Sequence, residues 1–306
     1  MKKIKGTLKT HLLLVLVTLF WGVTPSFMKV SLLEMDAFIF SSLRLFVALF
    51  TAGLLLLVSG SWKKVEKKDW VLFIIIGFFG FFVFQINFPL GVKYTSASIA
   101  ALIMATLPVN VVLINLLLKS EKITIRTIVG IILSIIGIVA IILGTKGGIS
   151  LEGTYTRGIV LLIISEIGFA LYTVKSKSLI TKYSLYQVIF IVILFSFIPF
   201  ITISAKQLLT FSILSVSFRA WTGIFFTGIF GSCLANILWY RGINHLGSTK
   251  TSIYANLPPV FGIIVSFIFL NETLTLLQIL GGIVIMLGVV LVNRKIPVKS
   301  SEEQIV

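Results

Sequence analysis

The sequence predicts an all-α integral membrane protein with ten transmembrane helices arranged as two inverted five-helix repeats. Of its 306 residues, 58% are hydrophobic and only 12% are charged, about half the charged share of a soluble domain. The chain also matches itself without gaps at a fixed shift, and each copy holds five long apolar runs. Because five is odd, the second copy enters the membrane with the opposite orientation. Many secondary transporters have this architecture.

The internal repeat pairs residues whose numbers differ by 228 − 77 = 151, as Gly77 and Gly228 do. Further pairs at this shift are Gly80 and Gly231, Gly91 and Gly242, Pro108 and Pro259, Glu121 and Glu272, Gly130 and Gly281, and Gly137 and Gly288. Gln85 aligns with another amide, Asn236. We therefore expect two domains, residues 11–143 with spans 1–5 and residues 158–293 with spans 6–10.

Each span is predicted from an apolar run of about 20 residues, the length that crosses a bilayer core of about 30 Å. The first five are His11–Leu32, Ala37–Val58, Trp70–Leu90, Thr95–Leu118 and Ile123–Leu143. The second five are Gly158–Ser178, Leu185–Ser204, Phe218–Tyr240, Ser248–Leu270 and Leu274–Val292. The basic start of the chain resembles a signal peptide, but no small-residue cleavage site follows, so we interpret this run as an uncleaved first span.

The distribution of Lys and Arg predicts the orientation. With the N-terminus inside, the inner segments hold 19 of the 26 basic residues and the outer segments hold five. This bias places both termini in the cytoplasm. The loop Lys119-Ser-Glu-Lys122 and its repeat partner Leu270-Asn-Glu-Thr273 agree with this, because both retain the acid while only the inner loop retains the cations.

Several function classes are excluded by composition. The net charge of +16 comes from basic residues between apolar runs, which is a topology signal rather than a nucleic-acid surface. The single Cys233 leaves no intrachain disulfide and no multi-cysteine metal site. We expect no metal and no cofactor. An enzyme would need clustered catalytic groups, and a channel would need a continuous polar path or a ring of charges. The sequence has neither pattern, so a channel or uniporter is only an alternative.

Two stretches of the chain resemble the EamA domain of the drug/metabolite transporter superfamily. The first runs from Lys93-Tyr-Thr-Ser-Ala-Ser through Leu107-Pro108-Val to Glu121, Gly130 and Gly137. The second runs from Leu246-Gly-Ser-Thr-Lys through Pro258-Pro259-Val to Asn271-Glu272-Thr-Leu, Gly281 and Gly288. Phe20-Trp21-Gly22 in the first span, echoed by Phe169-Ala170 in the sixth, adds to the likeness, which extends from about residue 11 to residue 293.

This resemblance implies a ten-helix carrier of the plasma (inner) membrane whose cavity is lined mainly by spans 1, 3, 4, 6, 8 and 9. We expect a secondary transporter that exports a small metabolite, such as an amino acid or a related compound, by alternating access. The alternative is an efflux carrier for drugs or for purines and nucleosides. The expected partners are the small-molecule substrate, the lipid bilayer and a proton as coupling ion, with a homodimer as a further option and no nucleic acid.

Glu166 is the one carboxylate of ten that lies in the middle of a predicted span. An acid at bilayer depth costs about 2.5–3.5 kcal/mol on insertion scales, so it must face a partner or water. Glu166 is therefore our first candidate for binding a coupling proton or a substrate amine. The structural alternative is an ion pair, or a protonated acid that is hydrogen-bonded between helices. Phe169, Ala170 and Thr173 share its helical face.

The remaining site candidates are polar or aromatic residues within spans. Arg44 could bind a substrate carboxylate, although we favour an arginine that snorkels to the interface or holds helix ends together. Gln85 and Asn236 are expected on opposite walls of one cavity, with interhelical hydrogen bonding as the alternative. The other candidates are Trp21, Asn110, Asn256 and Trp239, of which Trp239 could instead anchor at the membrane interface. Pro108 and Pro259, near mid-span, are candidate hinges whose alternative is a static kink.

Overall fold

The computed structural model describes residues 2–95, 100, 103–104, 106–143, 153–258, 260–261 and 275–293. Within these residues, six apolar helical stretches are long enough to cross a membrane: Leu8–Leu32, Ala37–Ser59, Lys67–Tyr94, Thr156–Ile180, Leu185–Thr210 and Phe218–Leu246. Shorter apolar helices occupy Leu107–Leu117, Ile125–Ala140 and Ile279–Asn293. The predicted ninth span is described only over its first part, which begins at Ser248. The described helices follow the order of the ten predicted spans.

The first half contains five spans along the chain. They are α1 (Lys2–Leu32), α2 (Ala37–Ser59), the continuous run α3 (Lys67–Ile74), η1 (Ile75–Phe82) and α4 (Val83–Tyr94), then α6 (Leu107–Leu117) and α7 (Ile125–Leu143). The second half repeats this series. It consists of α8 (Gly153–Ile180), α9 (Leu185–Thr210), η2 (Ile213–Ser215), the run α10 (Phe218–Phe226), η3 (Thr227–Leu234) and α11 (Ala235–Leu246), then α12 (Ser248–Ser252), η4 (Ile253–Asn256) and α14 (Leu276–Asn293).

Local sequence signals mark several helix ends. Asp36 caps α2 by accepting a 2.9 Å hydrogen bond from the backbone N–H of Phe38, and Ser184 caps α9 by accepting one from Gln187. These side chains satisfy N–H groups that have no partner within the helix. At the other end of α2, Gly60 adopts φ 56°, the left-handed conformation that glycine reaches without strain.

Two π-helical segments, η1 and η3, interrupt equivalent spans of the two halves. Each contains two glycines of the internal repeat, Gly77 and Gly80 in η1 and Gly228 and Gly231 in η3. A π turn is wider than an α turn, so it rotates the residues that follow it. Those residues include Gln85 in α4 and Asn236 in α11. The recurrence of this rare conformation in both halves agrees with the predicted repeat.

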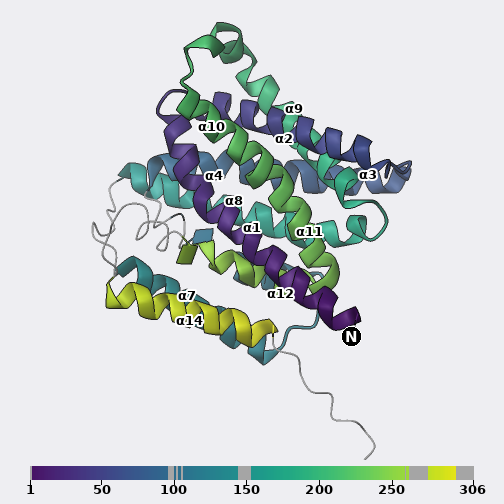
Figure 1. Cartoon of the computed structure of the whole chain (residues 1–306), viewed down its shortest axis with the longest axis vertical. Coiled ribbons are helices and arrows are strands. Elements are labelled where there is room, and N and C mark those ends of the chain that lie inside the picture. The colour runs from purple at the N-terminus through teal and green to yellow at the C-terminus, as the bar shows by residue number, and fades with distance from the viewer. Residues whose placement is uncertain are drawn as a thin grey trace, which may run out of the picture.

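The closest helix contacts obey the two-fold relation between the halves. α7 packs along α14 (Figure 1), and a Cβ added at Gly130 would lie 2.8 Å from the carbonyl oxygen of Gly288. A Cβ added at Gly137 would lie 2.5 Å from the carbonyl oxygen of Gly281. The repeat exchanges these two contacts, because it maps Gly130 onto Gly281 and Gly137 onto Gly288. These glycine faces therefore serve helix packing within the chain.

A second exchanged contact involves the π segments. Gly77 packs against Phe195 of α9, where an added Cβ would lie 2.6 Å from the Phe195 Cβ. Gly228 packs against α2, where its added Cβ would lie 2.8 Å from the carbonyl oxygen of Arg44. The shift of 151 converts Gly77 into Gly228 and Arg44 into Phe195. The third and eighth spans therefore approach their partners in the same way.

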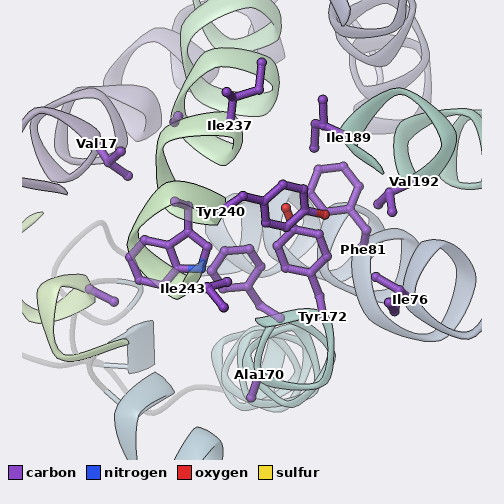
Figure 2. Packing of buried hydrophobic residues seen from close by; sticks show 14 of the residues in the cluster. Val17, Ile76, Phe81, Ala170, Tyr172, Ile189, Val192, Ile237, Tyr240 and Ile243 are labelled. Atoms are coloured by element: carbon purple, nitrogen blue, oxygen red, sulfur yellow. The ribbon is translucent and has the colours of Figure 1, made fainter. Parts of the chain in front are cut away.

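The buried core lies where the two halves meet. Figure 2 shows Tyr240 of α11 beside Phe81 of η1 and Tyr172 of α8, and the ring centroids of Tyr172 and Tyr240 are 5.4 Å apart. By contrast, the outward faces of the helices carry exposed apolar side chains, such as Phe46 and Phe50 of α2. An apolar outer surface around a partly polar interior is what a lipid environment demands.

Candidate functional site

A cavity lies between the two halves of the chain. It is lined from the first half by Trp21, Thr24, Met28, Arg44, Phe84, Gln85, Phe88, Met104 and Leu107. The second half contributes Glu166, Phe169, Gly231, Ser232, Asn236 and Ala255. Its volume is about 40 Å³, which is room for about three water molecules. In this conformation the cavity is therefore too small for anything much larger than a few water molecules.

Glu166 faces this cavity from the middle of α8. It is the fourteenth of the 28 residues of α8. This helix begins at Gly153, five residues before the predicted start of the span at Gly158. Its side chain is 2% exposed, and its Oε1 atom has no hydrogen-bond partner among the described residues. An unpaired polar atom at this depth is costly, and this one lies on the cavity wall.

Arg44 reaches the same cavity from α2. It is 3% exposed, so it does not snorkel to the interface, which was one of the structural alternatives. One guanidinium nitrogen, Nη2, donates a 2.9 Å hydrogen bond to Oε1 of Gln85, and the guanidinium carbon lies 5.3 Å from the ring centroid of Phe40. The Nε atom has no partner among the described residues. The arginine and the glutamate thus share one cavity without any ion pair between them in the described part of the chain.

Gln85 and Asn236 line the cavity from equivalent positions of the two halves. Gln85 accepts from Arg44 and donates to the hydroxyl of Ser232 at 3.5 Å. Asn236 accepts a 2.9 Å hydrogen bond from the hydroxyl of Tyr172 and donates to the backbone carbonyl of Ser232 at 3.0 Å. Ser232 therefore connects the two amides across the interface between the halves. Both amides line the cavity, and both also form hydrogen bonds between helices.

Aromatic rings form much of the remaining wall. Trp21 donates from Nε1 to the carbonyl oxygen of Gly231 at 3.2 Å, and its ring centroid is 5.4 Å from that of Phe169. Phe84 stands 4.7 Å from Phe169 by the same measure. Trp239 is fully buried behind this wall, 4.9 Å from Trp21, and donates to the hydroxyl of Thr173 at 3.2 Å. Trp239 is consequently a core residue next to the cavity and not an anchor at the membrane interface.

Three other candidates, Asn110, Asn256 and Pro108, are not among the residues that line the cavity. Asn110 is half-buried and donates to Thr106 at 3.4 Å. Asn256 is fully buried, and neither its Nδ2 nor its Oδ1 has a partner among the described residues. Pro108 is the second residue of α6, in the first helical turn, where proline is readily accommodated. Pro259 lies outside the described residues.

Some lining residues escaped the sequence analysis. Thr24 and Met28 line the cavity but were not among the candidates. They follow the candidate Trp21 by three and seven residues, a spacing that places all three on one face of a helix and could have identified them. Ser232 had no such signal, because it stands in a uniformly apolar run next to Cys233. No group of three or more His, Cys, Asp or Glu side chains in the described part of the chain could hold a metal ion.

Comparison with known proteins identifies the fold. The model of the EamA-like transporter family matches residues 8–143 and residues 156–294. A protein of Archaeoglobus fulgidus named an uncharacterized transporter is 27% identical over 94% of this chain and 100% of its own length. A second protein of that organism with the same name is 30% identical over 94% of this chain and 98% of its own length.

Further comparisons agree with this result. The uncharacterized transporter YetK of Bacillus subtilis is 28% identical over 83% of this chain and 77% of its own length. A solved crystal structure with 16% identity shares the fold at a TM-score of 0.76, covering 93% of this chain and 98% of the other. These matches confirm the predicted multi-pass, all-α membrane fold with inverted repeats and exclude an enzyme. The chain belongs to the EamA-like transporter family, and it is a membrane transporter.

Proposed function

We propose that this transporter carries a small zwitterionic metabolite, an amino acid or a related compound, by alternating access through the central cavity. The observation that carries the proposal is that Arg44 and Glu166 line one cavity and are not paired with each other. Polar groups that lack a partner in a medium of low polarity are unfavourable. A ligand with one carboxylate and one ammonium group would supply a partner to both side chains at once.

The cavity wall suggests how such a ligand would be oriented. The guanidinium of Arg44 is held by Gln85 through Nη2, which leaves Nε free to donate to a carboxylate. Oε1 of Glu166, which has no partner in the described part of the chain, would accept from the ammonium group. Trp21, Phe84 and Phe169 would cover an apolar side chain. Polar groups would thus orient the substrate while aromatic surface supplies contact area, as is usual for small-molecule sites.

Three further properties belong to the proposal. We infer that transport is directed outward across the plasma membrane with both termini in the cytoplasm, because of the family resemblance and the bias of basic residues. Glu166 would bind the coupling proton when it is not occupied by substrate. The two repeats, residues 11–143 and 158–293, would act as the units that rock around the cavity.

A set of matched ligands tests the substrate class. L-leucine carries both charges, 4-methylpentanoate lacks the ammonium group, and 3-methylbutylamine lacks the carboxylate. A ligand that binds the folded state at 100 times its Kd adds about 2.7 kcal/mol to the stability. We expect L-leucine or another L-amino acid to raise the Tm of the purified protein, and each single-charge analogue to raise it much less.

Two variants make the same test specific for the site. Arg44→Met should abolish the difference between the amino acid and the amine, and Glu166→Gln should abolish the difference between the amino acid and the acid. If adenine, a nucleoside or a cationic drug stabilises the protein and no amino acid does, the zwitterion proposal is wrong. The alternative of drug or purine efflux would then be supported, since the aromatic wall also fits a planar ring.

A further inference from the structure

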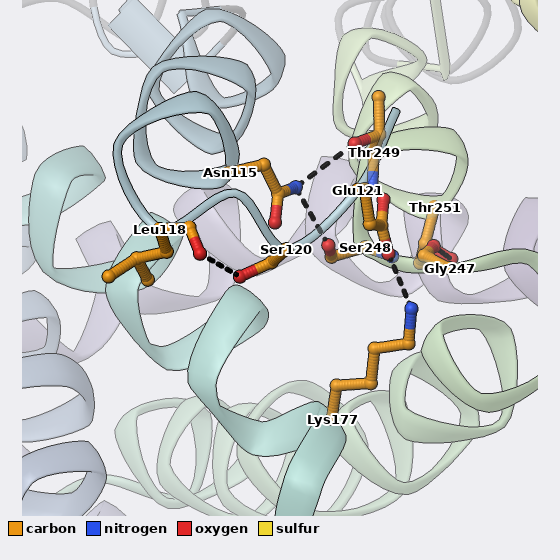
Figure 3. Close-up of polar contacts among 9 residues, drawn as sticks. All are labelled: Asn115, Leu118, Ser120, Glu121, Lys177, Gly247, Ser248, Thr249 and Thr251. Atoms are coloured by element: carbon orange, nitrogen blue, oxygen red, sulfur yellow. Dashed lines mark hydrogen bonds and ion pairs between the residues drawn. The ribbon is translucent and has the colours of Figure 1, made fainter. Parts of the chain in front are cut away.

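A polar cluster joins the two halves of the chain at one end of the helix bundle. The Glu121 cluster consists of Asn115 at the end of α6, Glu121 in the loop that follows, Lys177 near the end of α8, and Ser248 and Thr249 at the start of α12 (Figure 3). Three of its elements belong to spans that line the central cavity. None of its residues is part of the cavity itself.

Glu121 is the centre of this cluster. Its Oε1 accepts hydrogen bonds from Nζ of Lys177 at 2.8 Å and from the backbone N–H of Ser248 at 2.9 Å. Its Oε2 accepts from the backbone N–H of Thr249 at 3.0 Å. The first N–H groups of a helix have no partner within that helix, so the carboxylate from the first half satisfies donors that the second half cannot satisfy by itself.

Two neighbours shape the cluster around Glu121. Asn115 donates from Nδ2 to the hydroxyls of Ser248 and Thr249, both at 3.0 Å. Gly247 adopts φ 86°, and a Cβ at this position would lie 2.8 Å from Oε1 of Glu121. A side chain at residue 247 would thus be strained and would also push the carboxylate away, so the tight contact depends on glycine.

The cluster lies beyond one end of the cavity along several helices. On α6, Asn115 follows the cavity residue Leu107 by eight residues, or about 12 Å at 1.5 Å per residue. On α8, Lys177 follows Glu166 by eleven residues, or about 16 Å. The buried ring of Trp239, bonded to Thr173, occupies the region between. Along the helices, Trp239 and then the Glu121 cluster therefore follow the cavity in this direction.

We propose that the Glu121 cluster is the closed gate at this end of the transport path, and that it opens by releasing Glu121 from the start of α12. The cluster consists of contacts between the two halves, which are the units that move in a transporter of this architecture. The side chain of Lys177 is 43% exposed and that of Glu121 is 14% exposed. Water therefore reaches the cluster from the side that faces away from the cavity, and it can replace the hydrogen bonds when the gate opens.

Glu121 remains a carboxylate under physiological conditions. Burial raises its pKa, but the hydrogen bonds from Lys177, Thr249 and Ser248 together lower it further, and the pKa is held at about 2. The gate therefore does not respond to pH near neutrality. Any proton dependence of transport would have to come from another group.

The test measures access to a buried reporter when the cluster is weakened. Ser176 of α8 is fully buried beside Lys177, and Cys233 is the chain's single cysteine. Ser176→Cys in a Cys233→Ser background therefore supplies one buried thiol. Its rate of reaction with a membrane-impermeant maleimide is measured in inside-out and right-side-out vesicles. This inference rests on the alternating access proposed above, but the assay contains no substrate, so it succeeds or fails independently of the zwitterion proposal.

Glu121→Gln should raise the labelling rate about tenfold, the effect of losing one charge-assisted hydrogen bond, and only from the vesicle face on which the cluster lies. Lys177→Met retains the bonds to Ser248 and Thr249, so it should have a smaller effect and serves if Glu121→Gln does not insert. Glu66→Gln is the control, because it removes the partner of Lys68 in a surface ion pair whose side chains are 54% exposed at Glu66 and 73% exposed at Lys68. It should leave the labelling rate unchanged. Rates within twofold of the parent for both gate variants, or equal increases from both faces, would overturn the proposal.

Discussion

The substitution Glu166→Gln separates a functional carboxylate from a structural one. A charged carboxylate in the middle of a membrane helix costs about 2.5–3.5 kcal/mol on insertion scales. The side chain here is 2% exposed, and none of the described residues bonds to its Oε1. Glutamine has nearly the same shape and cannot be ionised. The variant should therefore be at least as stable as the wild type, and a gain of about 1 kcal/mol would raise the Tm by about 2 °C.

Transport should respond in the opposite direction. Loss of a charge-assisted hydrogen bond to a substrate ammonium corresponds to about 1.5–3 kcal/mol, or about 10- to 100-fold weaker half-saturation. If the same carboxylate binds the coupling proton, an imposed pH gradient should no longer stimulate transport.

The assay is uptake of radiolabelled L-leucine, or of whichever amino acid stabilises the purified protein, into proteoliposomes with and without a pH gradient. Glu66→Gln applies the same chemical change at an exposed site and should behave as the wild type does. Wild-type rates with unchanged pH dependence, together with a Tm that falls by several degrees, would refute the functional role. Glu166 would then be a structural acid that holds helices together.

Three further predictions concern packing, pH and topology. Gly288→Ala should destabilise the protein by about 1–3 kcal/mol in thermal unfolding, because the added Cβ would lie 2.6 Å from the carbonyl oxygen of Gly130. Gly282→Ala in the same helix is the control: among the described residues its Cβ would meet only Val260, at 3.9 Å, so this variant should be neutral or stabilising. The depressed pKa of Glu121, about 2, contributes stability that is complete above the unfolded value of about 4.5 and is lost as the pH falls through 2. The Tm difference between wild type and Glu121→Gln should thus be constant from pH 6 to 8 and shrink below about pH 4.5. In a Cys233→Ser background, a cysteine at residue 149 should react with impermeant reagent on intact cells, and one at residue 64 only after lysis; the reverse pattern would contradict the assigned orientation.

Much of the fold was predictable because its signals are local. The start of α2 was placed correctly at Ala37, where Asp36 caps the helix. The start of α8 was placed five residues late, since the stretch Gly153–Arg157 is polar and hydropathy does not detect a helix that continues out of the bilayer. The π segments η1 and η3 were not anticipated, because a run that is apolar on every face has no periodicity from which to distinguish a π turn from an α turn.

The candidate site was predictable as a set of residues and not as an arrangement. Glu166 stood out because one acid in an apolar span is rare. Arg44 was assigned mainly to a structural role, because the family resemblance did not place the second span on the cavity. In the structure, Gly228 packs closely against the backbone at Arg44, and Arg44 lines the cavity. Glu121 was noted as a repeat partner of Glu272, but nothing in the sequence connected it with Lys177, Ser248 and Thr249.

The sequence by itself determined that this chain crosses a membrane as helices and that its two halves are inverted repeats. Backbone groups in lipid must pair within their own helix, so apolar length alone defines each span, and an odd number of spans per copy reverses the second copy. The tertiary structure alone decided that Arg44 bonds to Gln85 and not to Glu166. Which polar side chains meet depends on the rotation and close approach of helices, and those are set by long-range contacts such as the glycine faces and not by local pattern.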